Sequence, residues 1–172
     1  MHTMKSRLVV ALTALAMVAA LDSRLQAADR TGREIYRYTL NGTALIIVPM
    51  KDGTATGTGW VVDLKNKLIV TNHHVVEENP RIFVLFPLFD KEGSVRSDRA
   101  DYKEQDGYRA KLIHFDKKKD LALIQVTDRL PDEVKELKVA GRSPDPGERV
   151  HAVGNPGASG ALWVYTSGSV RA

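Results

Sequence analysis

The sequence predicts an all-β fold, a barrel or a sandwich. Between Ala44 and Val126 roughly six short apolar runs follow one another, and polar or glycine-containing turns separate them. Valine, isoleucine and leucine dominate these runs, so they can form a core although only 6% of the residues are aromatic. Short strands at this spacing are typical of barrels and sandwiches.

The expected strands follow in chain order. A polar lead-in precedes the first strand at Ala44–Val48, which Pro49 ends, and "KDGTATGTG" supplies turn residues before "WVVD". The glycines of "TGTG" suit a hairpin with close backbone approach better than a phosphate loop. The charged segment 90–107 is expected to be an exposed loop. The remaining strands are expected at "LIVTN" (68–72), "RIFVLFPLF" (81–89), "YRAKLIHF" (108–115) and "DLALIQV" (120–126).

The chain changes character after Val126. Residues 127–148 are polar and contain three prolines, which indicates a connection, and two more strands are expected at "RVHAVG" and "ALWVYTSGSV". Two strands alone cannot close a barrel. We therefore expect a first β-barrel over residues 28–126, and a linker with the first strands of an incomplete second barrel over residues 127–172.

The N-terminal residues 1–27 have the pattern of a signal peptide. Lys5 and Arg7 precede an apolar run from Leu8 to Leu21, and Ala27 ends a small-residue cleavage site. The run is shorter than the ~20 residues that span a bilayer, so we expect export to the periplasm or the extracellular space without a stable membrane anchor.

Composition argues against several classes of function. The formal charge of +4 falls to +2 without residues 1–27, which contain three basic residues and one acidic residue, so it does not indicate a nucleic-acid partner. The absence of cysteine excludes a disulfide framework, a thiolate nucleophile and a cysteine metal site. No cofactor or metal is expected.

The segment "TNHHVV" directly follows an apolar strand and carries the candidate base. A catalytic imidazole needs a carboxylate that fixes its tautomer and stabilises the imidazolium. Asp120 is the best candidate because it begins a predicted strand, whereas Asp116 is flanked by Lys117–Lys119 and is expected to face solvent. His74 and Asp120 are therefore the candidate catalytic residues.

Five segments in order resemble the HtrA/Deg-type trypsin-like serine proteases: "GTGWVVD", "LIVTNHHVV", "KKDLALIQV", "GERVHAVGNPG" and "TSGSVRA". The resemblance covers about Thr56 to Ala172. It implies a chymotrypsin-like double β-barrel with the active site between the barrels, a polypeptide substrate and peptide-bond hydrolysis. It assigns the general base to His74 and the orienting carboxylate to Asp120, and it gives His73 no catalytic role.

The sequence departs from this family at the nucleophile. The family's serine lies in a "GNSGG" segment beyond the "TSG" strand, and residues 1–172 contain no such segment. Ser159 in "PGASGA" is disfavoured as a substitute, because the preceding "GNPG" already matches the family and too little chain separates Ser159 from Asp120. The 172-residue chain is thus expected to be truncated before the serine and nearly inactive by itself.

Alternatives remain beside this hypothesis. The chain could be a non-catalytic exported β-barrel module that binds unfolded protein or a partner chain, or part of a split enzyme that a separate chain carrying the serine completes. The expected protein partner is either a second copy in a homo-oligomer or such a complementing chain. A zinc site at His73 and His74 is disfavoured because adjacent strand residues point to opposite faces. His114 and His151 lie in apolar strands and are expected to be structural.

Overall fold

The computed structural model describes residues 31–157 and 160–171. The chain divides into two compact units, residues 1–35 and 36–172. All strands and the candidate site residues lie in the second unit, whereas the first turn of α2 lies in the first. The predicted signal peptide and Ser159 lie outside the described residues. None of the described helices is long and apolar enough to cross a membrane.

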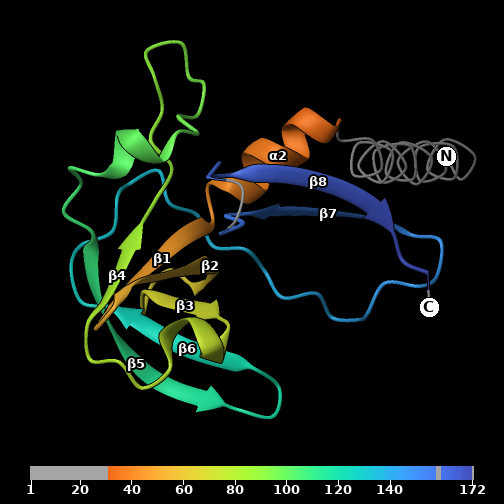
Figure 1. The fold of residues 1–172 in the computed structure, drawn as a ribbon. Helices are drawn as coiled ribbons and strands as arrows, with labels where there is room; N and C mark the ends of the chain where they lie inside the picture. Colours follow the sequence, from red (N-terminus) through yellow and green to blue (C-terminus); the bar gives the residue numbers. More distant parts are fainter. Residues whose placement is uncertain (1–30, 158–159, 172) are drawn as a thin grey trace, which may run out of the picture. The chain divides into compact units, whose positions relative to one another are not determined.

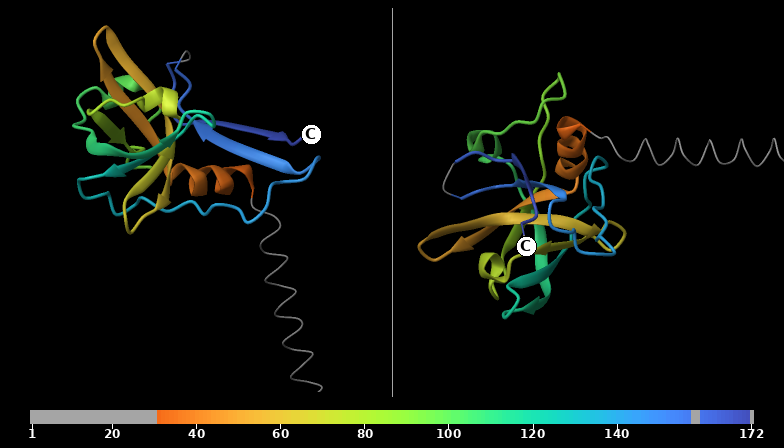
Figure 2. Two further views of the ribbon diagram at one scale, coloured as in Figure 1. Left: turned by 90° about the horizontal axis from the view of Figure 1, so that it is seen from below. Right: turned by 90° about the vertical axis from the view of Figure 1, so that its right-hand side faces the viewer.

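Six strands close into a barrel in the order β1-β2-β3-β6-β5-β4 (Figure 1), and two further strands pair in a separate sheet (Figure 2). All pairs of neighbours are antiparallel. The elements are α2 (Gly32–Leu40), β1 (Thr43–Met50), β2 (Gly53–Asp63), β3 (Leu68–Thr71), α3 (His73–Val76), β4 (Ile82–Leu85), the 3-10 turn η1 (Arg99–Tyr102), β5 (Tyr108–Asp116), β6 (Leu121–Val126), β7 (Arg149–Gly154) and β8 (Val164–Ser169). The predicted fold class is confirmed: a complete first barrel and a second sheet that is only begun.

The barrel core is formed by alternate residues of the apolar runs. In β6, Ala122, Ile124 and Val126 are buried, whereas the residues between them are not. Each buried isoleucine or valine side chain contributes roughly 1.5–3 kcal/mol relative to an exposed one. The inward residues of the six strands form one cluster, which includes Ala44, Ile46, Val48, Val61, Ile69, Ile82, Val84, Ala110, Ala122, Ile124 and Val126.

Two helices appear where the sequence predicted none. The predicted polar lead-in contains α2, whose first turn is stabilised by Thr31 and Glu34: Thr31 N donates to the Glu34 carboxylate (2.8 Å), and Glu34 N donates to Thr31 Oγ1 (3.4 Å). This is a capping box. The second helix, α3, contains both histidines of "TNHHVV", which were expected at a strand end.

Three other boundaries differ from the prediction. The segment "GTATGTG" is not a turn but the first half of β2, because it pairs with β1 in continuous register from Gly53 opposite Met50. The predicted strand 81–89 ends at Leu85, and Pro87, which lacks an N–H donor, follows shortly after. The charged loop 90–107 is not wholly exposed, because Tyr102 is 6% exposed and packs in a second core cluster.

Candidate active site

Helix α3 places His74 at the rim of the barrel, directly after β3. Valine residues disfavour helix, but Val75 and Val76 are buried against the barrel and this burial fixes the turn. The packing needs a glycine in β2: a Cβ on Gly57 would lie 2.5 Å from Val75 Cγ2. The close backbone approach expected of "TGTG" thus brings α3 onto β2, and it leaves the His74 side chain 71% exposed.

Asp120 lies opposite α3, directly before the first residue of β6. Its backbone adopts a φ of 52°, in the left-handed region that aspartate tolerates better than most residues. Its carbonyl oxygen accepts a hydrogen bond from His73 N (3.2 Å), and its carboxylate Oδ1 accepts one from His74 N (2.9 Å). Two successive backbone amides therefore hold the residue against α3.

The carboxylate of Asp120 also meets the His74 ring. Asp120 Oδ2 lies 2.6 Å from His74 Nδ1 and 3.1 Å from the side-chain nitrogen Nδ2 of Asn72. An ionised carboxylate can only accept, so neutral His74 must carry its proton on Nδ1, which leaves the Nε2 lone pair available as a base. The predicted pair of His74 and Asp120 is thus brought together by the fold.

Asn72 is a site residue that sequence reasoning did not single out. It stands at the N-cap position of α3 but makes no side-chain cap bond. Its amide instead donates to both the carbonyl oxygen and the carboxylate of Asp120, each at 3.1 Å. The available signal was its place in "TNHH", where an asparagine directly precedes a candidate base.

The environment lowers the pKa of Asp120. The backbone N–H of His74 is the largest cause, followed by the hydrogen bond from its imidazole. A carboxylate with a lowered pKa stabilises the fold above its unfolded pKa, and this contribution is lost as the pH falls through the lower folded value. Asp120 is therefore an anion throughout the neutral range, as the partner of an imidazolium must be.

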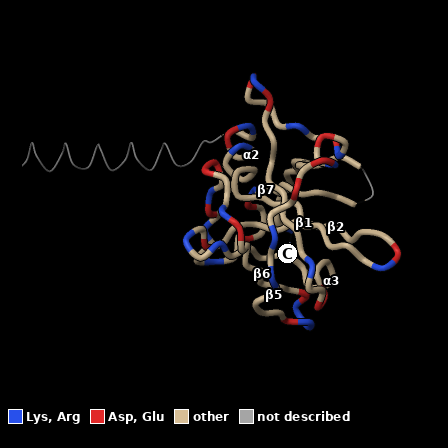
Figure 3. Tube along the Cα trace, turned by 90° about the vertical axis from the view of Figure 1, so that its left-hand side faces the viewer, with Lys and Arg blue, Asp and Glu red and all other residues tan. Residues whose placement is uncertain are grey.

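The turn before Asp120 fixes the neighbouring charges. Asp116 does not serve as an alternative partner for His74, because its Oδ1 accepts hydrogen bonds from the backbone N–H groups of Lys118 and Lys119 (3.0 and 3.1 Å). Lys117 Nζ lies 2.8 Å from Glu78 Oε1, which ties the β5–β6 turn to the residues after α3. Basic and acidic residues meet at this turn (Figure 3).

The other histidines take different positions. The ring of His73 packs on Phe115, with ring centroids 4.9 Å apart, and its buried Nε2 has no hydrogen-bond partner. His114 is exposed on β5, whereas His151 Nδ1 is hydrogen-bonded to Tyr165 OH at 2.7 Å. Among the described residues no group of three or more His, Asp or Glu side chains could hold a metal ion.

Comparison with known families assigns this arrangement. The trypsin-like peptidase domain matches residues 57–172, which contain β3, α3 and both members of the His74–Asp120 pair. The chain belongs to the trypsin-like peptidase family. The resemblance to trypsin-like serine proteases in the sequence is thereby confirmed, while the catalytic roles of His74 and Asp120 stay predictions.

Solved structures support the fold of this trypsin-like peptidase domain. The serine endoprotease from Yersinia pestis is 22% identical with a TM-score of 0.59, over 84% of this chain and 46% of that one. The Rv3671c protease in its inactive form is 21% identical with a TM-score of 0.55, over 78% of this chain and 54% of that one. The chain thus spans about half the length of these neighbours. No curated protein matches it.

The tautomer of His74 provides a direct test of the site. In chain labelled with ¹⁵N-histidine at alkaline pH, where imidazoles are neutral, we expect the ¹⁵N shifts of His74 to report the Nδ1–H form. Asp120→Ala should release the ring to the Nε2–H form, because the acceptor that holds the proton on Nδ1 is gone. Asp116→Asn is the control and should change nothing. An Nε2–H ring in the unchanged chain would contradict the geometry.

Proposed function

We propose that this trypsin-like domain supplies the first barrel and the general base of an exported serine endopeptidase. The observation that carries the proposal is the His74–Asp120 pair, whose geometry leaves Nε2 of an exposed imidazole available. His74 would take the proton of a serine hydroxyl as the serine attacks a peptide carbonyl, and would then return it to the leaving amine. Asp120 would hold the ring and stabilise the imidazolium.

The finer parts of the proposal come from the sequence. The HtrA/Deg type is supported by the five segments between Gly57 and Ala172. Export is supported by the basic residues and the apolar run at the N-terminus. A polypeptide substrate is supported by membership of the trypsin-like peptidase family.

Within this proposal the serine lies outside residues 1–172, which contain no "GNSGG"-like segment. It would be supplied either by further sequence or by a complementing chain, together with the backbone N–H groups that stabilise the oxyanion. The 172-residue polypeptide alone would then cleave nothing. If this polypeptide cleaved a substrate and Ser159→Ala abolished that cleavage, the proposal that the serine lies outside residues 1–172 would be wrong.

A chimera tests the function itself. Residues 1–172 are continued with the serine-bearing part of the Yersinia pestis serine endoprotease, and circular dichroism verifies that the product is folded. We expect cleavage of unfolded casein, which the same chimera with His74→Ala should lack. A folded chimera that leaves casein intact, while the Yersinia enzyme cleaves it, would contradict the proposal.

A further inference from the structure

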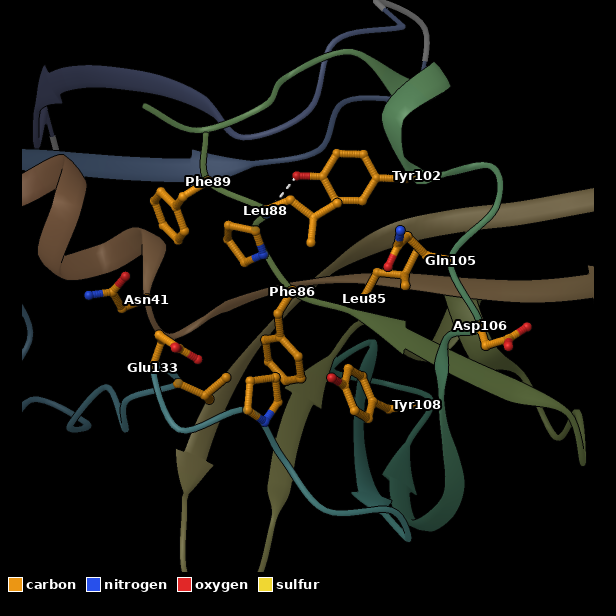
Figure 4. A pocket seen from close by; sticks show the side chains of 13 residues that line it. Asn41, Leu85, Phe86, Leu88, Phe89, Tyr102, Gln105, Asp106, Tyr108 and Glu133 are labelled. Carbon is orange, nitrogen blue, oxygen red and sulfur yellow. Dashed lines mark hydrogen bonds between the residues drawn. The ribbon is translucent and has the colours of Figure 1, made fainter. Parts of the chain in front are cut away.

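A groove lies beside β4, on residues separate from the candidate active site. Its volume is about 450 Å³, and none of Asn72, His74 and Asp120 lines it. The walls come from the segment after β4, from the loop that precedes β5, and from residues 131–134 of the linker (Figure 4). Nothing in the peptidase mechanism uses these residues.

The lining is mainly apolar and includes four aromatic residues and two prolines. Phe86 and Tyr108 stand together, with ring centroids 5.8 Å apart, while Phe89 is 40% exposed at the edge. Pro87 and Pro131 also line the groove. Rings and prolines lose little conformational entropy when a ligand binds, so such a surface favours apolar contacts.

Hydrogen bonds hold one wall in place. The hydroxyl of Tyr102 donates to Arg96 O (2.8 Å) and accepts from Leu88 N (2.9 Å) and from Trp163 Nε1 (2.8 Å). The dashed line in Figure 4 marks the bond to Leu88. The phenol thus uses its donor and both acceptor positions, so the groove is pre-formed rather than opened by a ligand.

The charges in the groove have one sign. Asp106 and Glu133 are the charged side chains among the described residues that line it, and both are exposed. In the view of Figure 4 they lie on opposite sides of the Phe86 and Tyr108 rings. Two carboxylates beside an apolar floor, without a cation in the lining of this groove, complement a ligand that is apolar and positively charged.

The groove is also elongated. A second hollow of about 720 Å³ shares five of its lining residues, among them Asp106 and Tyr108. The second hollow also contains Lys103 and Arg109, and Arg109 is paired with Asp128 (3.2 Å), so a basic side chain of a ligand belongs in the first hollow. A continuous trough of this kind has room for several residues of an extended chain. Aromatic grooves with acidic edges suit proline-containing peptides, whose extended conformation is preorganised.

We propose that this groove binds an extended peptide segment of a partner protein in which proline and an apolar residue stand next to lysine or arginine. The occupant contacts the exposed ring of Phe89 and the half-buried ring of Tyr108, over a floor to which the buried Phe86 contributes, and it is attracted by the charges of Asp106 and Glu133. This binding is independent of the serine and of the proposed peptidase activity.

Fluorescence anisotropy tests the proposal on the 172-residue chain carrying His74→Ala, so that binding is measured without the candidate base. The probe is fluorescein-labelled Gly-Pro-Leu-Arg-Pro-Leu-Arg-Gly, and its counterpart has glutamate in place of both arginines. We expect the arginine peptide to bind at least about tenfold more tightly than the glutamate peptide. Added salt should reduce this difference in affinity between the two peptides, because the carboxylates of Asp106 and Glu133 are exposed and are screened by ions.

Variants locate the binding. Phe89→Ala should weaken binding of the arginine peptide at least about fivefold. Glu133→Lys should weaken it by a similar factor at low salt. The controls are Ile113→Ala, which removes a similarly exposed apolar side chain (45%, against 40% for Phe89), and Asp52→Lys, which reverses an exposed charge elsewhere. The proposal would be overturned if neither peptide bound saturably or if both bound equally well. It would also be overturned if the control variants lost as much affinity as Phe89→Ala and Glu133→Lys.

Discussion

Replacing His74 by alanine in the serine-completed chimera is expected to lower kcat by about 10⁶-fold. The serine hydroxyl is a weak nucleophile at neutral pH, and no other imidazole among the described residues is hydrogen-bonded to Asp120. KM should change little, because the imidazole acts on the proton in the transition state rather than on substrate binding. Casein cleavage and steady-state kinetics on a chromogenic peptide provide the two measurements.

Replacing Asp120 is expected to lower kcat by less than replacing His74. Asp120→Asn places an amide where the carboxylate accepts from His74 Nδ1, so the ring loses its tautomer and its charge partner, and kcat is expected to fall by about 10⁴-fold. Asp116→Asn is the matched control, since Asp116 bonds the backbone of its own turn and not His74 in the described structure. Comparable losses in both variants would show that the turn matters through folding and not through His74.

Much of the barrel could be predicted because its strands carry their own pattern. The alternation in "YRAKLIHF" placed β5, and the apolar runs "LIVTN" and "DLALIQV" placed β3 and β6, all close to their observed limits. The pairing of His74 with Asp120 was predicted from the place of Asp120 at the start of a predicted strand and from the family resemblance, and the barrel places β3 beside β6. Apolar strand patterns and the family resemblance therefore carried the prediction.

The helices were missed for two different reasons. The capping box of Thr31 and Glu34 was present as a local signal, but the polar residues around it concealed the helix. Helix α3 has no such signal, since it consists of two histidines and two valines, and only burial of the valines in the finished barrel determines it. Tertiary packing thus overrides local propensity next to the candidate base.

Contacts between distant segments lay beyond sequence reasoning altogether. Thr58 Oγ1 accepts a hydrogen bond from Asn155 N (2.8 Å), and the Thr58 carbonyl accepts one from Thr71 Oγ1 (2.8 Å). The turn after β7 is thereby joined through β2 to the end of β3, one residue before Asn72. No periodicity predicts such bonds, because they depend on which side chains the closed barrel brings together.

Trp163 makes contacts of the same long-range kind, and it is the residue with the largest expected effect on stability. It is 2% exposed, at a φ of 59°, in the segment that leads into β8. Its N–H donates to Asn155 Oδ1 (2.9 Å), and its carbonyl accepts from Tyr36 OH (3.0 Å). Its indole Nε1 donates to Tyr102 OH (2.8 Å), so the side chain joins β8 to the loop before β5.

Trp163→Ala is expected to lower the free energy of unfolding by about 3–5 kcal/mol, because it leaves a large cavity and removes a donor from Tyr102. Trp163→Phe keeps most of the apolar area and loses the N–H, so it should cost about 1–2 kcal/mol. Urea titrations followed by circular dichroism measure both. The chain has two tryptophans, so Trp163 fluorescence in a Trp60→Phe background reports its burial separately.

Trp60→Ala is the matched control, because Trp60 is 38% exposed on β2 and its loss should cost less than about 1 kcal/mol. If Trp163→Ala cost no more than this control, the second cluster would not be coupled to the barrel. A large cost has a further consequence for the groove, since Tyr102 forms one of its walls and depends on the same indole. Trp163→Ala should then also weaken binding of the arginine peptide to the groove, although Trp163 itself does not line the groove.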